Sequence, residues 1–241
     1  MPTRKEVRTM SEAQSELYDA IYSFKNYEQE ATAIKSLIER KRPDARTVLD
    51  IACGTGKHAS FLQASYAVDG IDLNESHVEA ARTRNPKSRF TVGDMMSFQL
   101  NQTYDVITCL FSSIGFARTL RGVEQAVRSF KEHLEPDGII LIEPWFTPED
   151  WQPGYVTVHQ YESEDCKISR MSHSSTTGSI SILQFDYLIG RSNGIQHVQE
   201  RLELGLFSRD ELTELFIREG LHVEYDEKGL IGRGMYRLSR K

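Results

Sequence analysis

Hydrophobic side chains in the first 144 residues switch between two spacings, one typical of helices and one typical of buried strands. Between about Glu12 and Arg40 they recur at helical spacing, and the stretch YSFKNYEQE is a candidate break between two helices. Short apolar, β-branched runs then alternate with further helical patterns. The predicted strands cover residues 45–52, 66–73, 88–94, 103–111 and 138–144, and the predicted helices include 74–84 and 122–134. This alternation predicts an α/β fold with a doubly wound, mostly parallel sheet.

From about Tyr155 to Leu206, hydrophobic side chains recur at every second residue. They do so in four stretches, separated by the turn-like sequences EDC, TTG and SNG. This pattern predicts an antiparallel β insertion of four strands. A helix follows, begun by the capping box of Ser208 and Glu211, and two strands then close the chain as an antiparallel hairpin. The predicted organisation is a core of residues 1–144 and 207–241, with a mobile arm at 1–11, and a β insertion at 145–206.

Length and charge narrow the class of protein. The 241 residues correspond to roughly 1.6 domains of average size, as expected for one domain with a sizeable insertion. The net charge of −6 argues against a nucleic-acid partner, which normally requires clustered Lys and Arg, and favours a small-molecule partner. An anionic ligand would then need a local basic pocket.

The cysteines and the apolar runs indicate the cellular location. Three cysteines without a Cys-x-x-Cys pair are neither a disulfide framework nor a zinc ribbon, so we expect reduced thiols and no metal. The N-terminus lacks the apolar segment of a signal peptide, and no run reaches the ~18–20 apolar residues of a membrane span. We therefore expect a cytoplasmic protein without a membrane partner.

A glycine-containing turn and three aspartates are the main chemical signal. Gly54 and Gly56 lie between a predicted strand and helix, where the backbone can turn sharply and nucleotide-like ligands bind in open α/β sheets. Asp50, Asp72 and Asp94 each stand at the end of one of three successive predicted strands. Such carboxylates can accept hydrogen bonds from ribose hydroxyls and from the exocyclic amine of adenine. Met95 would then pack against the flat base.

Four interpretations of this loop compete. A P-loop is excluded, because it requires four residues between its glycine and Gly-Lys. The spacing Gly54-x-Gly56-x-x-Ala59 fits the dinucleotide loop of dehydrogenases, which cradles a pyrophosphate. S-adenosylmethionine (SAM) has a ribose and an adenine but no phosphate, and it fits carboxylates on three strand ends. A tight turn with capping aspartates is the purely structural interpretation. We expect SAM.

The stretches LDIACGTGKH, GIDL and VGDM and the final hairpin resemble class I SAM-dependent methyltransferases, over about residues 45–145 and 208–241. The resemblance implies a Rossmann-like core. A narrower resemblance spans most of the chain: LYDAIYSFKNYEQEA, CLFSSIGF, IEPWFTPEDWQPGYV, RMSHS and GLIGRGMY are similar to the N,N-dimethyltransferases of deoxyamino-sugar biosynthesis, of the desosamine and mycaminose type.

The narrower resemblance implies N-methylation of the amino group of a nucleotide-linked (dTDP) deoxyamino sugar in antibiotic biosynthesis, by a homodimer. An alternative within the enzymes is an N- or O-methyltransferase of another small metabolite or natural product. An NAD-dependent dehydrogenase and a non-catalytic SAM-binding module are alternatives of other classes.

Individual residues receive roles from the resemblance. The resemblance implies that residues 12–40 form a helical lid over the cofactor, with Lys25 reaching the methionine carboxylate. It also implies that the insertion forms a roof over the substrate. The cofactor site comprises Tyr18, Lys25, Asp50, Ala52, Gly54, Gly56, Asp72, Leu73, Asp94, Met95 and Leu110. The substrate site comprises Phe116, Trp145, Arg170, Ser172 and Arg233, and the candidate catalytic residues are Tyr22 and His173. Because residues three apart on a strand point to opposite faces, Arg170 and His173 cannot both line one pocket without a bulge.

Overall fold

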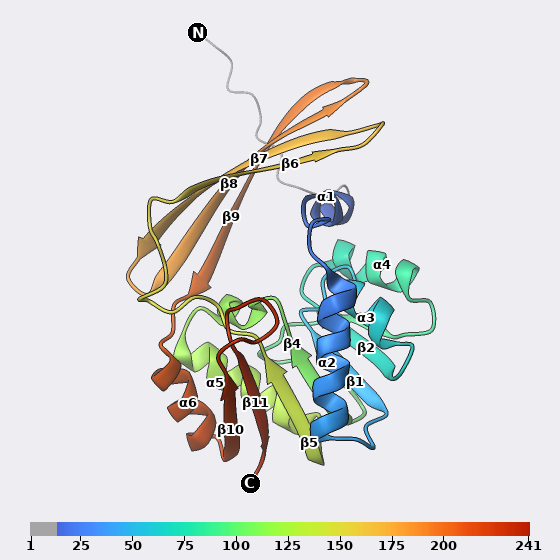
Figure 1. Ribbon diagram of the computed structural model, residues 1–241, viewed down its shortest axis with the longest axis vertical. Helices are drawn as coiled ribbons and strands as arrows, with labels where there is room; N and C mark the ends of the chain where they lie inside the picture. The colour runs from blue at the N-terminus through green and yellow to red at the C-terminus, as the bar shows by residue number, and fades with distance from the viewer. Residues whose placement is uncertain (1–13) are drawn as a thin grey trace.

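A seven-stranded sheet forms the centre of the structure, a computed structural model that describes residues 14–241 (Figure 1). Its strand order is β10-β11-β5-β4-β1-β2-β3, parallel from β5 to β3, with β11 antiparallel to both neighbours. The strands are β1 (Thr47–Ile51), β2 (Ala67–Asp72), β3 (Phe90–Val92), β4 (Tyr104–Cys109), β5 (Leu134–Ile142), β10 (Leu221–Asp226) and β11 (Met235–Arg240). The predicted sheet and C-terminal hairpin are confirmed, while the predicted arm at 1–11 lies outside the described residues.

Helices cover both faces of this sheet. The cores on the two faces share no residue, and β1 shows why: Val48 packs in one core and Leu49 in the other, because successive side chains of a strand alternate. One face carries α2 (Tyr27–Lys41), α3 (Lys57–Leu62) and α4 (Glu75–Arg84). The other carries α5 (Leu120–Glu132) and α6 (Arg209–Arg218). Both faces of the central strands β1 and β4 are therefore buried, as their continuous apolar runs predicted.

The helix starts follow from capping side chains. The side chain of Asn74 accepts a hydrogen bond from the Ser76 N–H at the start of α4, at 3.0 Å, and the capping box of Ser208 and Glu211 begins α6. The passage into β5 differs from the expectation. The strand already begins at Leu134, and Pro136-Asp137-Gly138 falls inside it, where the register with β4 shifts.

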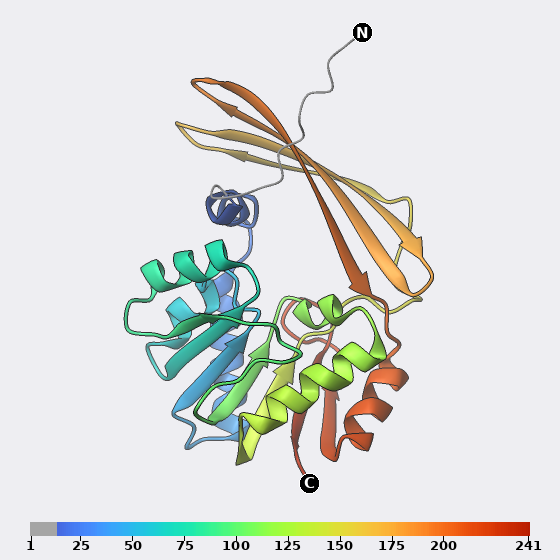
Figure 2. The same cartoon turned by 180° about the vertical axis from the view of Figure 1, so that it is seen from behind.

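A second sheet lies across the carboxyl ends of the core strands, as both views show (Figures 1 and 2). Its antiparallel strands are β6 (Val156–Glu162), β7 (Lys167–Thr177), β8 (Ile180–Arg191) and β9 (Gly194–Gly205), in sequential order. The chain leaves the core after β5 and returns to it before α6. We call β6–β9 the roof, and the loops at the carboxyl ends of β1 to β5 the floor. The predicted antiparallel insertion is thereby confirmed as part of the fold.

The short helix α1 (Gln14–Ile21) connects roof and core. Residues 22–26 separate it from α2, where the sequence indicated a break. Its Leu17 and Ile21 pack in one cluster with Phe185 of the roof. On the core side Asp19 forms an ion pair with Arg84. Among the described residues, no helix combines the length and apolar character needed to cross a membrane.

Candidate active site

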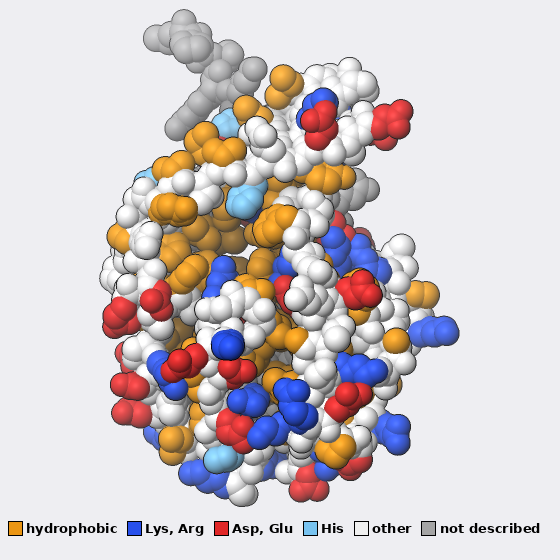
Figure 3. Space-filling view, in the orientation of Figure 1, with side chains coloured by type: hydrophobic (Ala, Val, Ile, Leu, Met, Phe, Trp, Pro, Cys, Tyr) orange, Lys and Arg blue, Asp and Glu red, His pale blue; other side chains and the backbone are white. Residues whose placement is uncertain are grey.

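A cavity of about 1530 Å³ lies between roof and floor, and the space-filling view shows it as a hollow lined by apolar side chains (Figure 3). Small-molecule pockets usually measure ~300–1,000 Å³. The cavity therefore has room for a cofactor and a second ligand together. Its walls come from α1 and the turn after it, from the floor loops, and from the inner face of the roof.

The loops after β1 and β2 meet at Asp72, whose carboxylate accepts the N–H of Gly54 and the N–H of Asn74, both at 2.8 Å. Ala52 and Gly54 have positive φ angles of 53° and 54°, so the loop turns sharply there. A Cβ at Gly54 would meet no atom within 4 Å, which leaves open space beside the backbone. Ala52, Gly54, Asp72 and the exposed Leu73 all line the cavity.

The loop after β3 adds a third polar position on the floor. Asp94 accepts the N–H of Met96 at 2.9 Å, so one of its oxygens holds the loop and the carboxylate faces the cavity beside Met95. Asp72 and Asp94 thus stand at the ends of adjacent strands, in the order expected for a ribose and an adenine.

Asp50 and Leu110 lie deeper than the residues above. Both line a small pocket of about 40 Å³ behind the glycine loop. Thr108 donates a hydrogen bond of 2.7 Å to Asp50, and burial raises the pKa of the Asp50 carboxyl. Asp50 therefore supports the floor from beneath, and direct contact with a cofactor remains a prediction for both residues.

Gly56 lies apart from the other predicted cofactor residues, because it lines neither the cavity nor the small pocket. Its φ is +71°, and a Cβ there would come within 2.7 Å of Asn85 Nδ2 and 3.0 Å of Ala81. The glycine therefore allows close packing of α3 against α4, and contact with a cofactor remains a prediction for this residue. Its N–H is also occupied, since it donates to the Cys53 carbonyl at 3.0 Å.

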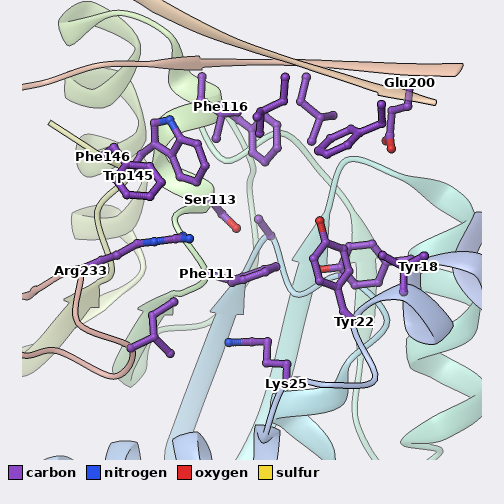
Figure 4. Close-up of a pocket in the computed structure, with 18 of the residues that line it drawn as sticks. Tyr18, Tyr22, Lys25, Phe111, Ser113, Phe116, Trp145, Phe146, Glu200 and Arg233 are labelled. Atoms are coloured by element: carbon purple, nitrogen blue, oxygen red, sulfur yellow. The ribbon is translucent and has the colours of Figure 1, made fainter. Parts of the chain in front are cut away.

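The turn between α1 and α2 closes one side of the cavity (Figure 4). Tyr18, Tyr22 and Lys25 line it, with 4.6 Å between the two tyrosine ring centres. The Lys25 ammonium forms a buried ion pair with Glu30, which also accepts a hydrogen bond of 2.8 Å from His58. Burial alone would raise the pKa of Glu30, but the hydrogen bonds from His58 and Lys25 outweigh it and lower that pKa. The lysine is thus fixed at the cavity wall.

The end of β4 stores backbone strain next to the cavity. Phe111 and Ser112 both have positive φ angles, of 51° and 62°, which non-glycine residues rarely adopt. The buried Glu143 holds this turn by accepting the Phe111 N–H at 2.6 Å, and its burial raises its carboxyl pKa. The 3-10 helix of residues 113–117 follows and presents Phe116 to the cavity.

Arginine and aromatic side chains form the wall opposite the lid (Figure 4). The Arg233 guanidinium lies 5.0 Å from the ring centre of Trp145 and 4.7 Å from that of Phe146. It donates a hydrogen bond of 3.0 Å to Ser112 Oγ. The Trp145 indole N–H donates to Ser181 Oγ of the roof at 2.8 Å. The loop after β5 is thus tied to the insertion at this wall.

The roof presents Arg170 and Ser172 to the cavity, whereas His173 lies on the other face of β7. The strand runs without a bulge between these residues, so alternation turns the His173 ring away from this cavity, and the geometry does not support the predicted catalytic role. Arg170 is 4% exposed, and its Nε and Nη1 have no hydrogen-bond partner in the described part of the chain. Its guanidinium lies against the rings of Tyr22 and Phe185.

The floor fits SAM better than a dinucleotide. The N–H groups of Gly54 and Gly56 are both used within the protein, so they are not free to cradle a pyrophosphate. Asp72 would hold the ribose hydroxyls of SAM, Asp94 and Met95 would hold the adenine, and Lys25 would meet the methionine carboxylate. Fold and site together define a class I SAM-dependent methyltransferase.

Comparison with known proteins agrees. Residues 48–138 match the family described as methyltransferase domain. The dTDP-3-amino-3,6-dideoxy-alpha-D-glucopyranose N,N-dimethyltransferase of Streptomyces fradiae is 37% identical over 226 residues, which cover 92% of this chain and 89% of the relative. The crystal structure of DesVI from Streptomyces venezuelae has a TM-score of 0.89 and 30% identity, covering 97% of this chain and all (100%) of that one.

SAM-bound CalS10, an amino pentose methyltransferase from Micromonospora echinaspora, has a TM-score of 0.85 and 31% identity, covering 99% of this chain and 100% of that one. The chain therefore belongs to the family of SAM-dependent methyltransferases that contains these sugar N-methyltransferases, and its cofactor is S-adenosylmethionine.

Two features of the site were not identified from the sequence. One is the strained turn that Glu143 holds at Phe111, and the other is Glu200 of β9, which lines the cavity from the roof. A motif match indicated the region of Phe111 but not its strain. Glu200 lies in a stretch of alternating residues, which shows that it shares a face with Val198 and Leu202 but not that this face is turned toward the cavity.

Proposed function

We propose that the protein transfers methyl groups from SAM to the amino nitrogen of a nucleotide-linked deoxyamino sugar. The observation that carries the proposal is Arg170, a buried cation in the wall of the cavity that forms no ion pair with any described residue. An unpaired buried charge is unfavourable, so its retention here indicates an anionic ligand. Guanidinium groups bind phosphates in a bidentate manner, and a nucleotide-linked sugar carries a diphosphate. The names of the relatives support the same substrate class.

The rest of the sugar nucleotide has complementary surfaces in the cavity. Trp145 offers an aromatic face for the base or the sugar, and Arg233 beside it adds a second cation. Ser172 lies next to Arg170 on the same face of the roof, and Phe116 stands on the floor side. We propose that these five residues bind the substrate and that the insertion as a whole is its binding unit.

The chemistry requires mainly positioning. The bound cofactor supplies a methyl group that is attached to a positively charged sulfur. A neutral amine can attack the methyl carbon and displace the sulfur. Holding the amine in line with that methyl group can lower the barrier by roughly 7–11 kcal/mol. We propose that Tyr22, which lines the cavity from the lid with its ring against Arg170, orients the amine with its phenol oxygen.

The decisive experiment incubates the purified protein with SAM and a panel of dTDP-linked 3-amino and 4-amino deoxysugars, with mass spectrometry of the products. A gain of one or two methyl groups on an amino sugar supports the proposal. The matched controls are the corresponding hydroxyl sugars, since methylation of those instead would establish the alternative O-methyltransferase. No mass gain on any amino sugar would contradict the proposal.

We further propose a homodimer that pairs the outer faces of two roofs. This face exposes Val158, Met171 and Leu188, which are apolar side chains on three adjacent strands. Met171→Asp should shift the sedimentation coefficient to that of a monomer. Ile217→Asp, an equally exposed apolar position on α6, should not. Equal behaviour of the two variants would contradict the pairing.

We also propose that the protein works in the cytoplasm and does not bind nucleic acid. The three cysteines are free thiols, as expected in a reducing compartment, and the excess of acidic residues opposes binding to phosphate backbones. Retention of the purified protein on a DNA or RNA affinity matrix at physiological salt would contradict the second part.

A further inference from the structure

Opposite charges stand unpaired on the inner face of the roof. Arg170 on β7 forms no ion pair with any described residue, and neither does Glu200 on β9, although both line the same cavity. Between them lies β8, so the two side chains are held apart and do not neutralise each other. A wall of this kind is complementary to a ligand that carries a negative and a positive charge at separate points.

Glu200 is held in place by one neighbour. The Tyr187 hydroxyl donates a hydrogen bond of 2.8 Å to its Oε2. Burial of Tyr187, and then the nearby Glu200 carboxylate, raise the pKa of this phenol far above its ordinary value, so it stays a donor at neutral pH. Figure 4 shows the carboxylate pointing down from the roof, on the side of the cavity where Tyr18 and Tyr22 lie.

The other carboxylates that line the cavity are engaged differently. Glu30 is paired with Lys25 and His58. Asp72 and Asp94 accept backbone N–H groups on the floor, where the cofactor is expected. Asp150 lies on the exposed rim and accepts from Thr147 at 2.9 Å. Glu200 is thus the lining carboxylate that is partly buried, is placed on the roof, and retains an oxygen for a ligand.

We propose that Glu200, positioned by Tyr187, binds the ammonium group of the substrate and thereby selects amino sugars over hydroxyl sugars. This inference rests on the proposed function. An aliphatic amine is protonated at neutral pH, so the arriving substrate is cationic at the sugar and anionic at the diphosphate. Arg170 and Glu200 match those two charges. The nitrogen must release a proton before attack, so recognition of its charge is a separate step from methyl transfer.

The test measures selectivity of binding. The full chain is saturated with S-adenosylhomocysteine and titrated in a calorimeter with a dTDP-3-amino-3,6-dideoxyhexose and with its 3-hydroxy counterpart. Glu200→Gln keeps the shape but removes the charge. It should weaken binding of the amino sugar by about tenfold or more, the value of a hydrogen bond to a charged group. Binding of the hydroxyl sugar should change by less than about twofold.

Two further variants define the role. Glu203→Gln changes the next acidic residue of β9, which lies on the outer face and is paired with Arg118 and Arg201, and should leave both affinities unchanged. Tyr187→Phe should weaken only the amino sugar, by about threefold, because Glu200 loses its positioning contact. Thermal unfolding of each variant confirms that it folds.

The outcomes separate the two proposals. If the wild type methylates amino sugars but Glu200→Gln weakens both ligands equally, or neither, the assignment of Glu200 is overturned while the proposed function stands. If the wild type binds S-adenosylhomocysteine but neither sugar nucleotide, both proposals are overturned. Loss of the amino-sugar preference in Glu200→Gln alone supports the assignment.

Discussion

The floor and the roof of the cavity treat their charged side chains differently. On the floor, Asp72 accepts two backbone N–H groups, and on the adjoining lid Glu30 is paired with Lys25 and His58. On the roof, two buried nitrogen atoms of Arg170 have no partner among the described residues, and Glu200 accepts a hydrogen bond from the Tyr187 hydroxyl. Asp72 and Glu30 thus have partners within the protein before any ligand arrives, whereas Arg170 and Glu200 of the roof form no ion pair with any described residue.

This difference indicates that the floor binds the cofactor and the roof selects the substrate. A cofactor that is the same in every turnover can be met by a preorganised surface, which lowers the entropic cost of binding. The substrate must be distinguished from similar sugars, and buried charges that remain unpaired with the wrong ligand provide that discrimination. The unpaired charges of the roof should therefore lower stability and increase specificity.

The largest effect is expected at Asp72 on the floor. Asp72→Ala removes the acceptor of two backbone N–H groups and the proposed acceptor of the ribose hydroxyls. The affinity for S-adenosylhomocysteine should fall by about 100-fold or more, since several hydrogen bonds to a charged group are lost. Calorimetric titration measures this.

The matched control for Asp72 is Asp69→Ala on the same strand. Asp69 accepts hydrogen bonds from Arg89, Gln102 and Tyr104, away from the cavity. This substitution should lower the free energy of unfolding by about 1–3 kcal/mol but leave the affinity for S-adenosylhomocysteine unchanged. If both variants lost affinity equally, the floor would be a structural site rather than a cofactor site.

Arg170 on the roof should give the opposite pattern of stability. Arg170→Met should weaken binding of a dTDP-sugar by about thirtyfold, because the diphosphate loses a buried cation. The free energy of unfolding should not fall, since an apolar side chain replaces an unpaired buried charge. Chemical denaturation and calorimetry measure the two quantities on the same sample.

Arg201→Met is the control for Arg170, because Arg201 lies half-exposed on the same sheet and is paired with Glu203. It should change neither quantity appreciably. A large loss of stability in Arg170→Met would show that the roof is satisfied without a ligand, and the contrast between roof and floor would then be wrong.

The two candidate catalytic residues differ in position, because Tyr22 lines the cavity and His173 does not. Tyr22→Phe should lower kcat/KM by about tenfold, as expected for loss of one hydrogen bond to a charged or reacting group. His173→Ala should leave kcat/KM unchanged, because its ring points away from the cavity. Steady-state kinetics with both variants decide this, and a loss of activity in His173→Ala would return the histidine to the site.

The floor could be predicted from the sequence and much of the roof could not, for a physical reason. Parallel strands end at one edge of a sheet, so Asp72 and Asp94 had to lie together once their strands were recognised. An alternating strand defines two sets of residues but not which set faces inward. The sequence therefore placed Arg170 and His173 on opposite faces, while the choice between them, and the position of Glu200, depend on how the insertion packs on the core.

The contact between roof and floor gives the smallest predicted effect. Asp19 of α1 is paired with Arg84 and accepts a hydrogen bond of 2.7 Å from Thr55, while Leu17 and Ile21 of the same helix pack on the roof. Asp19→Asn should weaken the contact of α1 with the core by about 1 kcal/mol of interaction free energy, the upper range for a partly exposed ion pair. S-adenosylhomocysteine should then dissociate about threefold to fivefold faster in stopped-flow measurements. Glu28→Gln, exposed on α2, is the control; equal dissociation rates in all three proteins would mean that α1 does not restrain the cofactor.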